Sequence, residues 1–160
     1  MKTLIFLSHF IFFITAEAST YKMNWIIKND LPIEIELKRA PQALKSRVGE
    51  HGLLTDQIFL PVRNVISDGK IKLTSDETGY LYIFIKNLSN KLIHFSVAPH
   101  GIEPSEAALG FTFNCLCKGH AYELKPKSTW YRIMSLVQTS SYKDPQKIIQ
   151  LDHVIFKIGK

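Results

Sequence analysis

Hydrophobic and polar residues alternate along much of this chain, and a period of two predicts β-strands. The clearest case is residues 33–38, IEIELK, where aliphatic side chains face one way and charged side chains face the other. Residues 80–85, YLYIFI, are apolar at every position, which predicts a strand that is buried on both faces. Further strands are expected at residues 71–73, 92–98, 111–117, 130–137 and 151–158.

Short turn segments separate these strands. The stretches SDGK at 67–70 and NLSNK at 87–91 carry the residues that favour turns. Residues 104–109, PSEAAL, give the only helical pattern, and it lasts little more than one turn. Residues 40–56 give no clear pattern and are left as a loop or a short helix. Short strands between turns predict an all-β fold, an antiparallel β-sandwich.

The N-terminus has the pattern of a secretory signal peptide. Lys2 precedes an apolar core at residues 4–14, and AEA at 16–18 matches the small-x-small cleavage pattern. The apolar core is shorter than the roughly 20 residues of a membrane-spanning helix. We therefore expect residues 1–18 to be a cleaved signal peptide, residues 19–160 to form one domain, and the protein to be periplasmic or secreted. The alternative is a membrane anchor formed by the uncleaved segment.

The charge balance is basic, with 20 Lys and Arg against 14 Asp and Glu, which gives a net charge of +6. The basic residues are scattered, which predicts a solvated basic surface or attraction to an acidic partner or an anionic membrane face. Because a basic stripe is missing from the sequence, we do not expect nucleic acid as a partner. No nucleophile motif such as Gly-x-Ser-x-Gly occurs, so we do not expect an enzyme.

The only two cysteines, Cys115 and Cys117, lie in the segment FNCLCKGH at 113–120. On an extended strand both thiols would share one face, with Cα atoms about 6.6 Å apart. That spacing is near the upper limit for a disulfide, and parallel Cβ directions are unsuited to one. Two parallel thiolates suit a soft ion such as Cu(I). A disulfide, within or between chains, and a pair of buried hydrophobic thiols remain as alternatives.

Other side chains are candidates to complete a copper site. His120 follows Cys117 closely, and Gly119 allows the chain to turn so that the imidazole faces the thiols. We therefore predict a site of Cys115, Cys117 and His120. The additional candidate ligands, on or after neighbouring predicted strands, are His94, His100 and Met134.

Four segments in order carry a resemblance to a known family: NLSNKLI at 87–93, GIEPSEAA at 101–108, FNCLC at 113–117 and LKP at 124–126. Together they resemble the CtaG family, the copper-delivery chaperone of cytochrome c oxidase assembly. The resemblance covers roughly residues 76–137, and the Cys-x-Cys is its most specific element. Leu116 and Lys118 stand where the family has phenylalanine, and a third cysteine found near the family's membrane anchor is missing.

The resemblance implies an immunoglobulin-like β-sandwich in which Cys115 and Cys117 bind Cu(I). It also implies delivery of copper to a recipient cuproenzyme, such as a subunit of a respiratory oxidase or another membrane-associated partner, and a homodimer is left open. One alternative is a cupredoxin-like sandwich that transfers electrons. Another is a structural or interaction sandwich with a redox-active cysteine pair.

Overall fold

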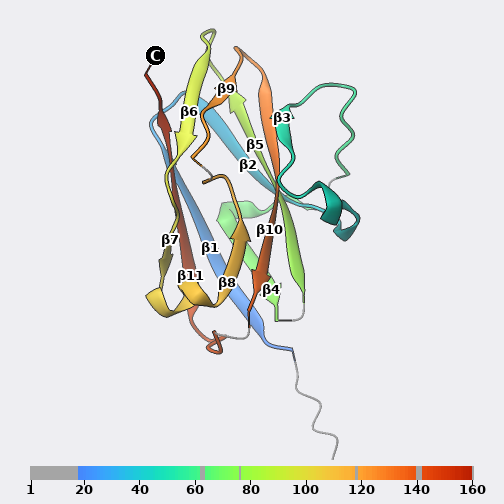
Figure 1. The fold of residues 1–160 in the computed structure, drawn as a ribbon, viewed down its shortest axis with the longest axis vertical. Helices are drawn as coiled ribbons and strands as arrows, with labels where there is room; N and C mark the ends of the chain where they lie inside the picture. Colours follow the sequence, from blue (N-terminus) through green and yellow to red (C-terminus); the bar gives the residue numbers. More distant parts are fainter. Residues whose placement is uncertain (1–17, 62–63, 76, 118, 140–141, 160) are drawn as a thin grey trace, which may run out of the picture.

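The computed structural model describes residues 18–61, 64–75, 77–117, 119–139 and 142–159. Within these ranges two β-sheets pack face to face, with only short 3₁₀ helices between strands (Figure 1). The predicted β-sandwich is therefore confirmed. Among the described helices, none is long and apolar enough to cross a membrane. The predicted signal peptide falls almost wholly on residues 1–17, which lie outside the described residues.

One sheet has six strands in the order β4–β1–β11–β6–β9, and β7 pairs with β11 as well. One pairing departs from the predicted antiparallel arrangement, because β1 and β11 run parallel. A parallel pair needs a long crossover connection, and nearly the whole chain lies between these two strands. The strands are β4 (Lys70–Thr74), β1 (Thr20–Asn29), β11 (Ile148–Lys157), β6 (Ile93–Val97), β9 (Tyr122–Leu124) and β7 (Gly101–Glu103).

The other sheet has five strands in the order β2–β5–β10–β3, and β8 also pairs with β10. Every pairing in this sheet is antiparallel. The strands are β2 (Ile33–Arg39), β5 (Thr78–Asn87), β10 (Thr129–Gln138), β3 (His51–Leu53) and β8 (Phe111–Asn114).

Apolar side chains fill the space between the two sheets. The central strand β5 is buried on both faces, as its continuous apolar run predicts. One face, with Leu81 and Ile83, joins the core between the sheets, and the other, with Tyr82, packs under a second cluster around Leu44. This second cluster forms because residues 40–56, for which the sequence predicted a loop or a short helix, contain the 3₁₀ helix η1 (Gln42–Arg47) and then β3. The other 3₁₀ helices are η2 (Ser67–Gly69) and η3 (Ser105–Leu109).

Strand β8 is shorter than predicted, because it ends at Asn114 instead of continuing to residue 117. Its last pairing with β10 joins Asn114 to Ser135. At the next hydrogen-bonding position of β10, residue Ile133 bonds to the backbone of Gly49 and Glu50, and β3 continues the pairing. The edge of β10 is therefore occupied, and the chain after Asn114 has to leave the sheet. Both cysteines lie in this departing segment.

Candidate metal centre

The departing segment brings the two cysteines closer together than an extended strand would. The Cα atoms of Cys115 and Cys117 are 5.7 Å apart, and the structure joins their sulfur atoms in a disulfide. This separation is within the usual range for a disulfide. The prediction that the local geometry disfavours such a bond is therefore wrong, because it assumed a strand that ends before Cys115. The same pair, once reduced, offers two adjacent thiols.

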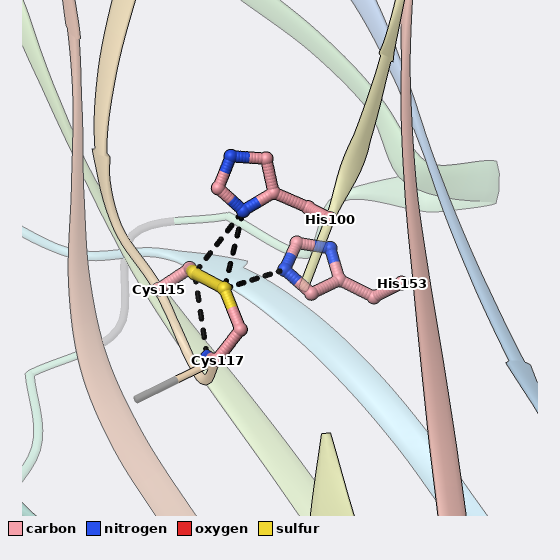
Figure 2. A group of neighbouring side chains, drawn as sticks. All are labelled: His100, Cys115, Cys117 and His153. Carbon is pink, nitrogen blue, oxygen red and sulfur yellow. Dashed lines mark hydrogen bonds between the residues drawn. A yellow bond between two sulfur atoms is a disulfide. The ribbon is translucent and has the colours of Figure 1, made fainter. Parts of the chain in front are cut away.

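His100 directs one ring nitrogen at both sulfur atoms (Figure 2). Its Nδ1 lies 3.1 Å from Sγ of Cys117 and 3.5 Å from Sγ of Cys115. The residue comes from the connection between β6 and β7, in the opposite sheet from β8. Partial burial lowers the pKa of His100 below its usual value, which favours the neutral ring with a free nitrogen lone pair. His100 is one of the additional ligands that the sequence suggested.

His153 is the fourth member of the group. It stands in the middle of β11 with its side chain in the core, fully buried. Its Nε2 lies 3.8 Å from Sγ of Cys117, and its Nδ1 accepts a hydrogen bond from the indole N–H of Trp25 at 2.9 Å. Burial, followed by the nearby His100, lowers the pKa of His153 to about 4, so the ring is neutral at neutral pH. This histidine was not among the ligands predicted from the sequence.

The donor atoms of His100, Cys115, Cys117 and His153 all lie within 4.8 Å of one another. Phe113 packs edge-on against both imidazoles, with its ring centroid 5.8 Å from each. Cys115 and His153 are buried, whereas Cys117 and His100 are partly exposed. The group therefore has an apolar inner wall and one side that is open to solvent.

These four side chains define the chemistry that the group can support. Two thiolates and imidazole nitrogen are ligands for Cu(I) and zinc. No carboxylate belongs to this group, so it does not fit Ca²⁺ or Mg²⁺, which take oxygen ligands. In the disulfide form the sulfur atoms carry no negative charge to bind a cation. The group is thus a candidate metal centre whose ligands depend on the oxidation state of the cysteine pair.

The predicted ligand His120 is not brought into this group. Gly119 has the positive φ that was expected, 70°. The turn nevertheless leaves His120 exposed, with its ring edge-on to Tyr122 at a centroid distance of 6.2 Å. Its backbone carbonyl accepts a hydrogen bond from the Ser96 hydroxyl. The side chain of His120 therefore belongs to the surface near β9.

His94 lies outside the group, and Met134 lies in the core between the sheets. On β6 the side chains of Ile93 and Phe95 face the core, so His94 between them faces away from it, opposite Glu123 of β9. Met134 is fully buried in the core between the sheets. Of the two additional histidines that the sequence suggested, only His100 belongs to the group.

A buried hydrogen-bond chain holds the backbone between the two cysteines. The Tyr122 hydroxyl donates to the carbonyl of Leu116 at 3.1 Å, and Nη1 of Arg132 donates to that hydroxyl at 3.3 Å. Arg132 is only 1% exposed, and no ion pair joins it to a carboxylate of the described residues. Desolvation lowers the pKa of Arg132 and raises that of Tyr122. Tyr122 and Arg132 thereby fix the backbone at Leu116, between the two cysteines.

The fold and the centre together define the protein as a β-sandwich with a partly buried Cys₂His₂ group. Residues 20–158 match the model of a family described as a domain of unknown function, DUF8709, and the chain belongs to this family. No curated protein matches the sequence. The matched range includes β1 to β11 and all four residues of the centre.

Proposed function

We propose that this protein is an exported copper carrier that binds Cu(I) with its cysteine pair and passes it to a recipient cuproenzyme. The observation that carries the proposal is the convergence of His100 Nδ1 on both cysteine sulfur atoms, at 3.1 Å and 3.5 Å. Thiolates are soft ligands that select Cu(I), and Cu(I) accepts two or three of them. The ion is cargo, so the protein is not an enzyme.

The exposure of the ligands suits transfer. Cys115 is buried, whereas Cys117 and His100 are partly exposed. A ligand of the recipient can approach the ion from the open side, displace Cys117 or His100 first, and leave Cys115 as the last ligand. A low coordination number keeps each exchange simple, because an incoming ligand finds room at the ion before another one leaves.

Copper loading requires reduction of the cysteine pair. Two electrons and two protons from a dithiol reductant convert the disulfide into two thiols, while the dithiol becomes oxidised. Binding of Cu⁺ as a bis-thiolate complex then releases the two thiol protons. Oxidation of the pair in an exported protein would remove both thiolate ligands, so the compartment has to supply such a reductant.

The nature of the recipient rests on the resemblance to the CtaG family. That resemblance favours a subunit of a respiratory oxidase as the recipient. The protein would reach it at the membrane face after export directed by the expected signal peptide, residues 1–18. The net charge of +6 supports docking on an acidic partner or an anionic membrane face. A homodimer that shares copper between two cysteine pairs is compatible with the open side of the centre.

Titration of the reduced chain with Cu(I) under anaerobic conditions tests the proposal. We expect one tightly bound Cu(I) per chain, and loss of that binding in the double variant Cys115→Ser, Cys117→Ser. The oxidised protein is the matched control, because it has the same sequence without free thiols. Absence of binding by the reduced protein, or equal binding by the double variant, would overturn the proposal.

One observation favours a second candidate, a sandwich whose cysteine pair acts as a redox-active or structural disulfide. The two sulfur atoms are joined in the structure. Mass measurement of the native protein after thiol alkylation separates the two candidates. One copper bound to the native chain, together with two thiols that become alkylated once the metal is removed, supports the carrier, whereas a metal-free chain that alkylation leaves unmodified supports the disulfide protein. A blue-copper site gains less support, because such a site uses one cysteine, whereas the group here contains two.

A further inference from the structure

The hydrogen bond between Trp25 and His153 decides which nitrogen of the histidine carries the proton. The indole Nε1 lies 2.9 Å from His153 Nδ1. An indole nitrogen can only donate a hydrogen bond, so Nδ1 must accept with its lone pair. A neutral imidazole carries one proton, which therefore resides on Nε2. This is the nitrogen that faces the Cys117 sulfur at 3.8 Å (Figure 2).

A protonated nitrogen has no lone pair for a metal ion. Histidine ligands in metalloproteins show the opposite arrangement, in which the non-ligating nitrogen donates its N–H to a carboxylate, a carbonyl or water. Here the nitrogen remote from the centre meets a donor instead of an acceptor. His153 is thus arranged to donate an N–H to the Cys117 sulfur, whereas no such donor opposes the Nδ1 lone pair of His100 in the described contacts.

We propose that Trp25 sets the metal preference of the centre by holding His153 as the Nε2–H tautomer, a hydrogen-bond donor to Cys117 and not a ligand. This inference rests on the proposed function for the identity of the ion. The centre then has three ligands, Cys115, Cys117 and His100. Three ligands suffice for Cu(I), whereas structural zinc sites use four. Trp25 is accordingly a specificity-determining residue that acts through His153.

The surroundings keep both rings in place. Trp25 is 3% exposed and His153 is fully buried, so water does not readily replace either partner. The strands that carry them are adjacent, with Trp25 opposite Leu151 in the register of β1 and β11. Phe113 packs edge-on against the indole at a centroid distance of 5.1 Å. The Nδ1–H tautomer would set two N–H groups against each other and leave both without an acceptor.

The variant Trp25→Phe separates this role from packing. It keeps an aromatic ring and removes the N–H, so His153 can move its proton to Nδ1 and offer Nε2 as a fourth ligand. We expect zinc to bind roughly tenfold to a hundredfold more tightly, the range in which outer partners of ligands change metal affinity. Cu(I) affinity should change by less than about threefold, because its three ligands remain. The matched control is Trp130→Phe, since Trp130 is also 3% exposed but packs on Phe95 and Tyr122.

Two measurements test the inference. Long-range ¹H–¹⁵N NMR of the reduced, metal-free wild-type protein should show His153 with a proton on Nε2 and none on Nδ1. Competition titrations with Zn²⁺ and with Cu(I) should show tighter zinc binding in Trp25→Phe and unchanged zinc binding in Trp130→Phe. A proton on Nδ1 in the wild-type protein overturns the inference, and so does equal zinc affinity in wild type and Trp25→Phe.

The outcomes distinguish this inference from the proposed function. If the wild-type protein fails to bind Cu(I), the carrier function falls, while the tautomer and the zinc comparison still decide the role of Trp25. If Cu(I) binds but its addition removes the Nε2–H signal of His153, the histidine is a ligand and the inference is wrong. The NMR measurement needs no variant, so it decides even if Trp25→Phe does not fold.

Discussion

Nδ1 of His100 lies 3.1 Å from Sγ of Cys117, although 17 positions separate the two residues in the chain. The contact joins the two sheets, because His100 follows β6 of one sheet and Cys117 follows β8 of the other. It forms where β8 has left the edge of β10, so the irregular backbone at the cysteines is what lets them reach across the sandwich. The candidate metal centre is thereby a consequence of how the strands compete for β10.

Replacement of His100 tests its place among the proposed copper ligands. His100→Ala should weaken Cu(I) binding roughly tenfold to a hundredfold, because one of three ligands is lost while both thiolates stay. Competition against a Cu(I) chelator at pH 7 is the measurement. His120→Ala is the matched control, since His120 is exposed and outside the group, and its affinity should equal that of the wild type. If His120→Ala weakens binding as much as His100→Ala does, the assignment is wrong.

The hydroxyl of Tyr122 should matter for both stability and copper affinity. Tyr122→Phe leaves the Leu116 carbonyl without its hydroxyl donor and costs about 1–3 kcal/mol in the free energy of unfolding. Because Leu116 lies between the two cysteines, Cu(I) affinity should fall as well. Tyr82→Phe is the control, since it removes a hydroxyl bond to the Pro61 carbonyl in the other cluster. Urea unfolding measures the loss of stability, and chelator competition measures the affinity for Cu(I). Equal losses of copper affinity in the two variants would refute the prediction.

The neutral His153 should make the folded state sensitive to acid. Its pKa is lowered to about 4 by burial, whereas an exposed histidine in the unfolded chain has a pKa near 6.5. Between these values the unfolded chain binds more protons, so the free energy of unfolding decreases as pH falls from about 6.5 to about 4. The full effect is roughly 3 kcal/mol. The measurement is urea unfolding of the reduced, metal-free protein at a series of pH values.

A His153→Gln variant isolates this contribution. It should be less stable than the wild type at pH 7, and its stability should depend less steeply on pH in the same window. Glu50, whose pKa is lowered to about 2 mainly by its hydrogen bond from Arg47, acts below pH 4.5 and so below most of this window. Parallel pH profiles for wild type and variant between pH 6.5 and 4 would contradict the assignment of the effect to His153.

The segment that displaces β8 from β10 is held by a charged hydrogen-bond group. Arg47 donates two hydrogen bonds to the Glu50 carboxylate, at 2.6 Å and 2.7 Å, and the Tyr131 hydroxyl donates to it at 2.6 Å. Glu50→Gln removes the charge, and we expect it to lower the free energy of unfolding by about 0.5–1 kcal/mol, since the group is partly exposed. High salt should reduce the difference in the free energy of unfolding between the wild type and Glu50→Gln. An effect that grows with salt would argue against an ionic origin.

The sequence predicted the elements whose patterns are local. Alternation between apolar and charged side chains gave β2, and the continuous apolar run gave the doubly buried β5. The two thiols were recognised from their spacing, and His100 because it follows the predicted strand that precedes the cysteine segment. The end of β8 could not be predicted in this way, because it depends on Gly49 and Glu50, which reach β10 from far away in the sequence.

His153 was missed for a similar reason. Its hydrogen bond to Trp25 joins residues 128 positions apart, on β11 and β1 at opposite ends of the chain. A local signal was nonetheless present. Ile149, Leu151 and Ile155 face the core at every second position, so the same alternation places His153 on the core face. A histidine in a row of buried aliphatic residues needs a partner, and this requirement could have marked it as a candidate.

X-ray absorption at the copper edge of the Cu(I)-loaded, reduced protein tests the central claim most directly. The proposed centre predicts two sulfur ligands from Cys115 and Cys117 and one nitrogen ligand from His100. In the His100→Ala variant the nitrogen contribution should disappear while both sulfur ligands remain. A copper ion with no sulfur ligand, or a spectrum unchanged by Cys115→Ser together with Cys117→Ser, would contradict the claim that this cysteine pair binds copper.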